Sequence, residues 1–512
     1  MLKRLRPHQS EPVYRTASLR AIEEMASHAL PSHTLMQRAG RAVARLVQAR
    51  FPHARRIVVL AGAGNNGGDG LVAATHLQAA GRDVRILACG ASSLDAWSRR
   101  LPPDAAWALG EAKVRQIPCV LQQPPHQSLP AADLYVDALL GIGLTGPVRD
   151  AIAAVISALN AQTQAPVLSV DLPSGLDADR GTCGNVCVRA TVTLSLLGVK
   201  PGLCTGPAAS RCGEVWSDDL DLPSPPADSP PDAVLLGADH VRPLLPKLLH
   251  AAHKGDRGDV IVVGGAPGMT GAALLAARAA ARLGAGRVFV GLQGPNAPGV
   301  DPVAPELMLR PPQALLSAAR KGGCLVFGPG AGTEATAGQL LAQALAQPVP
   351  LVLDADGLNL LAQAGPDPDL LGLLRQRSAA TVLTPHPLEA ARLLGIDAGQ
   401  VQRDRLQAAQ DLAERYGAWV VLKGAGSVIA SPQRHLWINP TGNGLLATAG
   451  SGDVLAGAIA AAIATTSTVQ SLLAAVWLHG RAADLAAAQH GSADFTAECL
   501  PQWMAKAWAE IE

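Results

Sequence analysis

The sequence predicts an α/β protein of two domains, each built on a largely parallel β-sheet. Along both halves of the chain, short runs rich in β-branched residues alternate with segments of helical periodicity, the pattern of parallel sheets covered by helices. Between the halves, residues 218–232 read DDLDLPSPPADSPPD, a composition that holds neither a helix nor a central strand. We therefore expect a first domain over residues 1–220, a linker over 221–232 and a second domain over 233–512. The two halves do not repeat one another.

The expected elements follow from the same patterns. In the first half, a helical stretch at 18–50 precedes strands at 56–61, 84–88, 134–137, 167–171 and 191–196. In the second half, strands are expected at 260–264, 287–290, 324–327, 349–353, 380–383 and 419–422. Residues 454–478 carry no charge, but a glycine, a run of Thr and Ser, and a glutamine interrupt them. We expect two buried helices there rather than a membrane span.

Composition excludes several classes of protein. Hydrophobic residues make up 48% of the 512 residues and charged residues 16%, so the chain is not intrinsically disordered. Aromatic residues make up 3%, which argues against a base-stacking single-strand binder, and the net charge of +1 provides no field for nucleic acid. The basic first six residues are followed by no apolar segment, so no secretory signal is expected. The eight cysteines form no CxxC pair, which predicts free thiols in a cytoplasmic protein.

The first predicted strand runs into a glycine-rich turn, IVVLAGAGNNGGDG at residues 57–70. Its glycines fit the G-x-G-x-x-G fingerprint of dinucleotide binding. Two features argue against ordinary NAD binding: the next strand ends without an acidic residue, and Asp69 would repel a pyrophosphate at the helix N-terminus. A tight connection capped by Asp69 is the plain alternative, but it does not account for Asn65 and Asn66 beside that aspartate.

Two further predicted strands end in aspartate. Asp137 closes LYVD and is followed by ALLGIGLTGP, and Asp171 lies within VLSVDLPSG. In a parallel sheet these acids and Asn66 emerge together at the carboxyl edge, where ligands bind. A lone aspartate at a strand end is more often a turn former, but three such oxygen donors suit a hard cation or a proton-transfer site.

These motifs resemble the amino-terminal YjeF domain over nearly all of residues 10–215, through GNNGGDG at 64–70, VDALLGIGLTGP at 136–147 and VDLPSG at 170–175. That family epimerises the hydrated forms of NADH and NADPH at C6 of the nicotinamide ring, so the resemblance implies a Rossmann-like three-layer sandwich with this activity. It implies that the hydrated cofactor contacts Asn65, Asn66, Gly67, Gly68, Asp69, Gly141, Ile142, Gly143, Leu144, Thr145, Gly146, Pro147 and Asp171. It also implies a potassium ion held by Asn66, Asp137 and Ser174. Inverting C6 needs a carboxylate to move a proton, and the sequence leaves open whether Asp137 or Asp171 does so.

In the second half, the phosphate-binding signal is a helix start, and no P-loop motif occurs. AGSGD at 449–453 precedes an apolar helix, so that backbone amides and the helix dipole face a phosphate while Asp453 acts as a base on a nearby hydroxyl. Lys423 follows a strand upstream and adds a cation. A small-residue helix cap is the plain alternative for AGSGD.

With HKGDRG at 253–258, VFGPGAG at 326–332 and LTPHPLE at 383–389, this half resembles the ribokinase-like ADP/ATP-dependent NAD(P)H-hydrate dehydratases over about 235–505. The resemblance implies a three-layer sandwich, a substrate site near Ala272, Gly332, His386 and Asp453, and a nucleotide site at Lys423, Gly424, Ala425, Gly426, Ser427 and Gly452, with magnesium accompanying the nucleotide. His386, between two prolines, is either a ligand contact or a turn residue, and His479 is expected in the core or at a helix end. The family's usual Asn-Pro-Gly is Asn443-Gly444-Leu445 here, so no contact is carried onto Gly444 or Leu445.

The implied function is repair of damaged nicotinamide cofactors in two steps. The first domain would interconvert the R and S hydrates, and the second would phosphorylate and dehydrate the S epimer, releasing AMP and phosphate if ADP is the donor. The alternative is a ribokinase-type small-molecule kinase whose first half is a non-catalytic binding or dimerisation module. A homo-oligomer is expected from the resemblance, with no nucleic-acid or membrane partner. Because aromatic residues are scarce, we expect a nicotinamide pocket of small residues and carboxylates.

Overall fold

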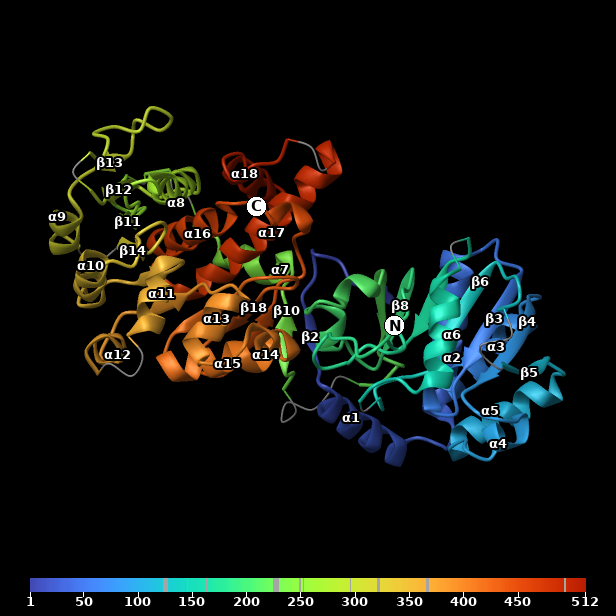
Figure 1. Cartoon of the computed structure of the whole chain (residues 1–512). Coiled ribbons are helices and arrows are strands. Elements are labelled where there is room, and N and C mark those ends of the chain that lie inside the picture. Colours follow the sequence, from blue (N-terminus) through green and yellow to red (C-terminus); the bar gives the residue numbers. More distant parts are fainter. Residues whose placement is uncertain are drawn as a thin grey trace. The chain divides into compact units, whose positions relative to one another are not determined.

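The computed structural model describes residues 1–122, 128–144, 146–162, 164–223, 230–247, 250–251, 253–294, 296–319, 323–364, 368–491 and 494–512. The chain forms two compact units, one of Met1–Arg6 and Glu11–Ala233, the other of Pro7–Ser10 and Val234–Glu512. Each unit is an α/β sandwich, which confirms the predicted fold class (Figure 1). Residues 224–229, the middle of the expected linker, lie outside the described residues.

The sheet of the first unit has the strand order β1-β9-β8-β7-β6-β3-β4-β5, and every neighbouring pair is parallel except β1 with β9. Its strands are β1 (Lys3–Arg4), β3 (Arg56–Ala61), β4 (Asp83–Cys89), β5 (Cys119–Gln122), β6 (Leu134–Ala138), β7 (Val167–Val170), β8 (Val192–Leu196) and β9 (Glu214–Asp218). The short strand β2 (Glu11–Val13) is bridged to Val199. The helices are α1 (Thr16–Ala29), α2 (Thr34–Arg50), α3 (Asn65–Ala79), α4 (Leu94–Ser98), α5 (Pro103–Val114) and α6 (Asp150–Asn160).

Side-chain alternation along β3 explains the three layers of this unit. Ile57 and Val59 pack with α2, α3 and α5 in one core cluster, whereas Val58 and Leu60 pack with α6 in another. Helices therefore cover both faces of the sheet, as the apolar runs of buried parallel strands require. The helical stretch predicted at 18–50 is two helices, because the chain turns at His33, whose φ is 66°.

The sheet of the second unit runs β13-β12-β11-β14-β15-β16-β17-β18-β19-β10. The pairs from β13 to β17 are parallel, and β18 pairs antiparallel with both β17 and β19. Its strands are β10 (Ala233–Leu235), β11 (Asp259–Gly264), β12 (Arg287–Leu292), β13 (Met308–Leu309), β14 (Gly323–Phe327), β15 (Leu351–Leu353), β16 (Thr381–Leu383), β17 (Trp419–Leu422), β18 (Val428–Ala430) and β19 (Leu436–Ile438).

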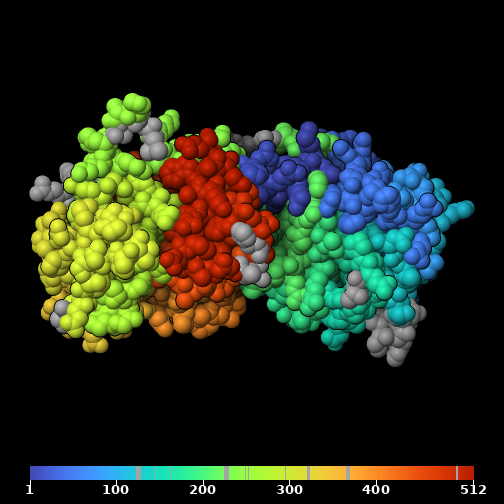
Figure 2. Space-filling model, turned by 90° about the horizontal axis from the view of Figure 1, so that it is seen from above, coloured from blue at the N-terminus to red at the C-terminus, as the bar shows by residue number. Residues whose placement is uncertain are grey.

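Helices cover both faces of this second sheet (Figure 1). They are α7 (Ala238–Val241), α8 (Thr270–Arg282), α9 (Pro312–Ser317), α10 (Ala335–Leu345), α11 (Asp356–Gln363), α12 (Pro368–Arg375), α13 (Pro387–Leu394), α14 (Ala398–Arg403), α15 (Arg405–Tyr416), α16 (Ser451–Thr466), α17 (Leu472–His490) and α18 (Leu500–Ala509). The last part of the chain, red in Figure 2, forms a continuous area of this unit's surface.

Helices α16 and α17 are the two buried helices expected at 454–478. They meet at Ser467, whose left-handed φ of 57° ends α16. The close packing of α16 on α8 depends on Gly457, since a Cβ there would lie 1.9 Å from the carbonyl oxygen of Ala276. No helix in the described part of the chain is both long and apolar enough to cross a membrane.

Candidate active sites

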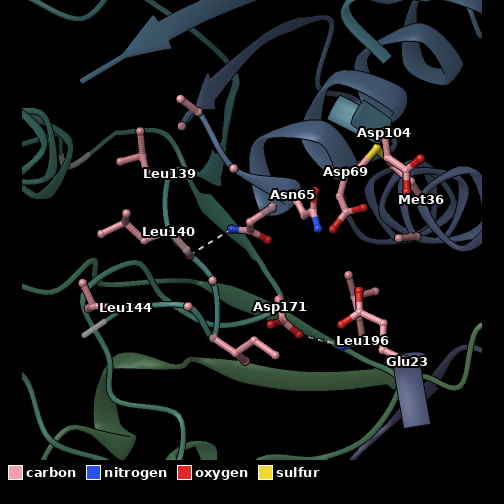
Figure 3. Close-up of a pocket in the computed structure, with 18 of the residues that line it drawn as sticks. Glu23, Met36, Asn65, Asp69, Asp104, Leu139, Leu140, Leu144, Asp171 and Leu196 are labelled. Atoms are coloured by element: carbon pink, nitrogen blue, oxygen red, sulfur yellow. Dashed lines mark hydrogen bonds between the residues drawn. The ribbon is translucent and has the colours of Figure 1, made fainter. Parts of the chain in front are cut away.

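A cavity of about 860 Å³ opens at the carboxyl edge of the first unit's sheet. Its walls come from α1, the first turn of α3, the loop after β6 and the segments after β7 and β8 (Figure 3). The predicted contact residues that line it are Asn65, Asn66, Asp69, Gly141, Ile142, Gly143, Leu144, Pro147 and Asp171. Gly67 and Gly68 are buried within α3, Gly146 is outside the lining, and Thr145 lies outside the described residues.

Glycine allows the turn before α3 to fold tightly against its neighbours. A Cβ on Gly62 would lie 1.9 Å from the carbonyl oxygen of Leu139, and one on Gly67 would lie 2.0 Å from that of Gly62. A side chain at Gly62 would push the end of β3 away from the loop after β6, and one at Gly67 would push α3 away from the turn that precedes it. The two asparagines at the start of α3 are thereby held beside that loop, where the Asn66 amide nitrogen donates to the Leu140 carbonyl at 2.9 Å.

Asp137 is completely buried and is surrounded by hydrogen-bond donors. Its carboxylate accepts from the Ser174 hydroxyl at 2.6 Å, the Ser169 hydroxyl at 2.8 Å and the Ser174 amide at 2.9 Å. Burial raises the pKa of Asp137, and these hydrogen bonds oppose the rise. Asp137 and Ser174 do not line the cavity.

The three residues predicted to hold potassium lie around one region. Ser174 contacts Asp137 directly, and its hydroxyl also accepts from the Leu140 amide at 2.9 Å, next to the carbonyl that Asn66 contacts. The Asn66 side-chain oxygen is buried and has no hydrogen-bond partner among the described residues. This unpaired buried oxygen, connected through Leu140 to the Ser174 hydroxyl and the Asp137 carboxylate, is a donor of the type that a hard cation takes.

Asp171 lies in the cavity wall directly after β7, in a backbone conformation with φ of 68°. Lys200 donates from its ammonium group to the Asp171 carboxylate, to the Leu196 carbonyl at 2.7 Å and to the Ser195 hydroxyl at 3.1 Å. The Lys200 side chain is only 1% exposed. The sequence analysis missed this residue, although it follows a predicted strand end, as the two aspartates do.

Four more carboxyl groups line the cavity, those of Glu23, Glu24, Asp69 and Asp104. Burial raises the pKa of Asp69 well above its usual range, and the charges of Asp171, Glu23 and Asp104 raise it further. Burial and the Asp171 charge also raise the pKa of Glu23. Asp104 differs because the His33 ring contacts its carboxylate at 2.5 Å. Figure 3 shows Asp69, Glu23 and Asp171 facing the same space.

Arginines also line this cavity, which the sequence analysis did not predict. They are Arg20 on α1, Arg100 after α4 and Arg149 before α6. The described lining contains no Phe, Tyr or Trp. Its walls are therefore small and aliphatic residues, carboxyl groups and guanidinium groups.

A second cluster of polar residues forms at the carboxyl edge of the other sheet. Lys423, after β17, donates to the Asp354 carboxylate at 2.7 Å, and the Thr384 hydroxyl donates to the same oxygen at 2.7 Å. Gly452, in the first turn of α16, lies beside this pair, since a Cβ there would be 3.2 Å from the Lys423 ammonium. Gly450 precedes α16 with φ of 89°. Strands β15, β16 and β17 thus meet the N-terminus of α16, which attracts anions.

The charges at this cluster shift one another's pKa values. Burial and the Asp354 charge raise the pKa of Asp453 to about 6, against the lowering effect of Lys423. For Lys423, burial lowers the pKa, but the charges of Asp354, Glu389 and Asp453 together raise it above its usual value. An Asp453 carboxyl with a pKa near neutrality beside a permanent cation suits proton transfer.

His386 forms the cap of α13. Its ring nitrogen accepts from the amides of Leu388 at 3.1 Å and Glu389 at 3.3 Å, while its own amide donates to the Glu389 carboxylate at 2.8 Å. His386 therefore has the turn-forming role that was one of the two roles expected for it. Burial raises the pKa of Glu389 to about 7.

The other predicted substrate residues lie at loops near the same edge. Gly332 donates its amide to the Asp356 carboxylate at 2.8 Å, and Ala272, in the first turn of α8, is close to Gly330. A cavity of about 530 Å³ is lined by Thr333, Asn359, Ala362, Gln363 and Arg392. The sequence analysis missed Asp354 and Asp356, although DADG directly follows a predicted strand.

The KGAGS segment after β17 is held in place by hydrogen bonds from a buried arginine. Gly424 has φ of 142°, and Gly426 has φ of 61°, so only glycine fits well. The Arg405 guanidinium, at the start of α15, donates to the carbonyls of Leu422 at 3.1 Å and Lys423 at 3.3 Å. The Ser427 hydroxyl donates to the Gly424 carbonyl at 3.2 Å. Ala425 and Gly426 make further contacts.

Two remaining features of this unit have structural roles. The Asn443 loop, which departs from the family pattern, is held by Asp484, whose carboxylate accepts from the Asn443 amide group at 3.0 Å and the Gly442 amide at 3.1 Å. His479 is buried on α17 and donates to the Ser451 carbonyl at 2.9 Å, which confirms its expected place in the core. Burial lowers the pKa of His479 to about 4, so its ring is neutral.

Comparison with known proteins supports the family resemblance of each half of the chain. Residues 32–202 match the family model described as YjeF-related protein N-terminus, and residues 260–503 match the one described as NAD(P)H-hydrate dehydratase. The chain is 38% identical to the bifunctional NAD(P)H-hydrate repair enzyme Nnr of Coxiella burnetii, across 94% of this chain and 96% of that one. It is 35% identical to Nnr of Escherichia coli, across 90% and 87%. A solved structure of the ADP/ATP-dependent NAD(P)H-hydrate dehydratase of Bacillus subtilis, co-crystallised with ATP and Mg²⁺, is 31% identical, covers 54% of this chain and 98% of its own, and has a TM-score of 0.49. With two family models in this order and full-length relatives of this similarity, the chain belongs to the bifunctional NAD(P)H-hydrate repair enzymes.

Proposed function

We propose that the first unit interconverts the R and S hydrates of NADH and NADPH, and that the second dehydrates the S epimer with a nucleotide. The observation that carries this is the presence in one chain of two different sites at sheet edges. One is a large cavity lined by carboxyl groups, and the other joins Lys423 and Asp453 at a helix N-terminus. The first suits proton transfer on a large ligand, and the second suits phosphoryl transfer.

For the epimerase, the surroundings of the two candidate aspartates favour Asp171 as the base. Asp137 is completely buried and its oxygens are occupied by serine and backbone donors, whereas Asp171 faces the cavity. A base must reach the proton it removes. Asp137 then belongs with Asn66 and Ser174 as a ligand for potassium, which would supply positive charge beside the glycine-rich loop that begins at Gly141.

For the dehydratase, Asp453 would accept the proton of the C6 hydroxyl while a phosphoryl group passes from the nucleotide to that oxygen. The amides at the start of α16 and the Lys423 ammonium would stabilise the charge on the transferred group. Phosphate then leaves C6 and a proton leaves C5, restoring the ring double bond. Phosphate is a better leaving group than hydroxide, which explains why a nucleotide is needed.

We assign the ligands of this unit accordingly. The nucleotide would lie against the segment from Lys423 to Ser427 and against Gly452, and the nicotinamide hydrate against Ala272, Gly332 and His386. Magnesium would enter with the nucleotide phosphates, and the carboxylate oxygens of Asp354 and Asp356 are donors of the type it prefers.

The test supplies pure S hydrate of NADH with ADP or with ATP. We expect reduced nicotinamide to return only when a nucleotide is present, with one phosphate released for each NADH formed. Comparing the two nucleotides gives the preference, and chelation of magnesium should stop the reaction. If neither nucleotide restores NADH, the dehydratase assignment is wrong and the kinase alternative gains support.

We further propose that the chain acts in the cytoplasm as a homo-oligomer. All eight cysteines are free, as a reducing compartment requires. The apolar residues of α16 are buried within their own unit, so an interface would use other surfaces. Light scattering of the purified chain gives its mass in solution, and a monomer mass at assay concentration would contradict the oligomer.

A further inference from the structure

The epimerase cavity contains carboxyl groups in unlike surroundings, and this difference suggests separate chemical roles. The inference rests on the proposed function, since it concerns how the first unit inverts C6. Asp171 is paired with a buried cation, and Asp69 is not paired. When two carboxyl groups in one site are held in opposite states, one can serve as base and the other as acid.

Lys200 forms an ion pair with Asp171 and fixes the orientation of its carboxylate. Its ammonium group is buried, and two neighbouring oxygens, on Ser195 and Leu196, hold it in place against the carboxylate. The Leu196 amide donates to the same carboxylate oxygen at 3.2 Å. The ammonium and the amide both contact Oδ1, and no described donor contacts Oδ2. One oxygen therefore stays available to a ligand in the cavity.

Asp69 has the opposite surroundings. It belongs to the first turns of α3, and its carboxyl group forms no hydrogen bond with any described residue. The charged groups that face it are Asp171 from the segment after β7, Glu23 from α1, Asp104 from α5 and Lys200. Three of these four are negative, and burial and their charges raise the pKa of Asp69. The protonated form is therefore favoured, as an acid requires.

We propose that Asp171, held by Lys200, accepts the proton of the C6 hydroxyl while Asp69 donates a proton to the ring nitrogen. The O–H bond breaks and its electrons form the C6 carbonyl, as the C6–N1 bond breaks and leaves its electron pair on N1. The Asp69 proton then makes an N–H bond. The opened chain rotates about its C5–C6 bond, and the reverse steps close the ring with C6 inverted and both carboxyl groups restored.

Glu23 and Asp104 fit the acid role less well. Asp104 is already contacted by the His33 ring. Burial and the Asp171 charge raise the pKa of Glu23 as well, but Glu23 lies on α1, a helix with Leu19 as its one buried residue. Asp69 is held more firmly, because α3 is buried along most of its length.

The experiment follows conversion of the pure R hydrate into the S hydrate by the full chain without nucleotide, so that the dehydratase is silent. We expect D69N and D171N to lose at least about 100-fold in kcat with little change in KM, the usual effect of removing a general acid or base. The pH–rate profile of the wild type should show an alkaline limb, in which the rate falls as Asp69 loses its proton. D69N should lack this limb. E23Q should retain more activity than D69N.

Lys200 is a positioning residue, so its test needs a readout beyond loss of activity. K200A should be slow, and a small alkylammonium ion added to the assay should restore part of the rate, which repair of a purely structural defect would not do. Glu111, exposed on α5 and away from the cavity, provides the control E111Q, which should match the wild type. The ADP-dependent turnover of S hydrate by each variant shows that the second unit is intact. A thermal melting curve of each variant shows whether the first unit is still folded.

The outcomes are separable. If the wild type does not convert R into S, the epimerase assignment fails and this inference fails with it. If the wild type is active and D69N keeps its rate and its alkaline limb, only the inference is overturned. Equal losses in D69N and E23Q, or no rescue of K200A by amines, would overturn the assigned roles of Asp69 and Lys200 respectively.

Discussion

At the scale of single residues, the dehydratase site that we propose depends on Asp453 and the charges around it. Asp453 lies in the first turn of α16, where backbone amides favour a negative charge, but burial and Asp354 disfavour one. Lys423 opposes these effects from beside Gly452. The result is a carboxyl group that ionises just below neutral pH, where a base is most effective.

We expect D453N to lower the dehydratase rate by about 100-fold to 1,000-fold and to leave the epimerase rate unchanged. The base works only when ionised, and the Asp453 pKa is about 6, so the wild-type rate should rise as pH increases through 6. K423M removes a cation that favours the ionised form of Asp453, so the rising limb of the pH–rate profile should move to higher pH. The pH dependence of kcat with S hydrate and ADP measures both effects.

A matched control is D411N, since Asp411 is exposed on α15 and contacts only Gln407 at the surface. It should keep the wild-type rate and pH profile. An unshifted limb in K423M would show that Lys423 does not set the ionisation of Asp453.

Residue patterns predicted part of each site. Asp137, Asp171 and Asp453 were predicted because strand ends and helix starts place polar groups at a ligand edge. The same rule applied to DADG would have found Asp354, and applied to LLGVK it would have found Lys200. That Asp171 lines the cavity and Asp137 does not was not predictable, because it depends on which serines and loops close over each aspartate.

At the scale of elements, Arg405 links α15 to the end of β17 and to the segment that we propose binds the nucleotide. It is buried, and burial lowers its pKa to about 10, so it remains charged. Its guanidinium holds the carbonyls of Leu422 and Lys423, the residues that lead into the predicted phosphate-binding turn.

We expect R405M to raise the KM for ADP by about tenfold, because leaving buried carbonyls without donors costs about 1–3 kcal/mol and frees the turn to move. Epimerase activity should not change, since all of these contacts lie within the second unit. R405K, which keeps one donor group, should fall between R405M and the wild type. Steady-state kinetics with varied ADP gives the result, and an unchanged KM would contradict this role for Arg405.

Gly457 offers a test of how α16 packs. We expect G457A to destabilise the second unit by about 1–3 kcal/mol, because the new methyl group would overlap the Ala276 backbone. Gly338, on α10, is the matched control: nothing lies within 4 Å of its Cβ position, and G338A should stabilise by about 0.5–1 kcal/mol. Urea unfolding measures both, and equal effects would show that α16 and α8 are not in close contact.

The central strands were predictable and the marginal ones were not. The ranges 56–61 and 419–422 match β3 and β17 because long apolar runs between turn signals mark buried parallel strands. Strands β18 and β19 have three residues each, too few to show any periodicity, and β5 lies at a sheet edge with a mixed composition. The helical pattern at 18–50 hid a turn that depends on the left-handed backbone of His33.

At the scale of the whole molecule, two α/β units with different strand orders form from one chain. The first unit ends at Ala233, just past the Asp- and Pro-rich stretch, but Pro7–Ser10 belong to the second unit by their contacts. Those contacts include the Ser10 amide with Asp239 at 2.8 Å. That four residues near the N-terminus belong to the second unit cannot be predicted from the sequence, because it depends on contacts between distant residues.

The small net charge hides local concentrations of charge. The value of +1 is compatible with three arginines and several carboxyl groups around one cavity. Arg20, Arg100 and Arg149 are therefore candidates for contacts with the phosphates of the hydrate.

The central claim is that one chain carries two catalytic sites that act in sequence, and one assay tests it directly. An equal mixture of R and S NADH hydrates is supplied with excess ADP, and the absorbance of reduced nicotinamide is followed. The wild type should restore all of the NADH, D171N should stop at half, D453N should restore none, and D171N mixed with D453N should again restore all of it. Full restoration by D171N alone, or no gain when the two variants are mixed, would contradict the account.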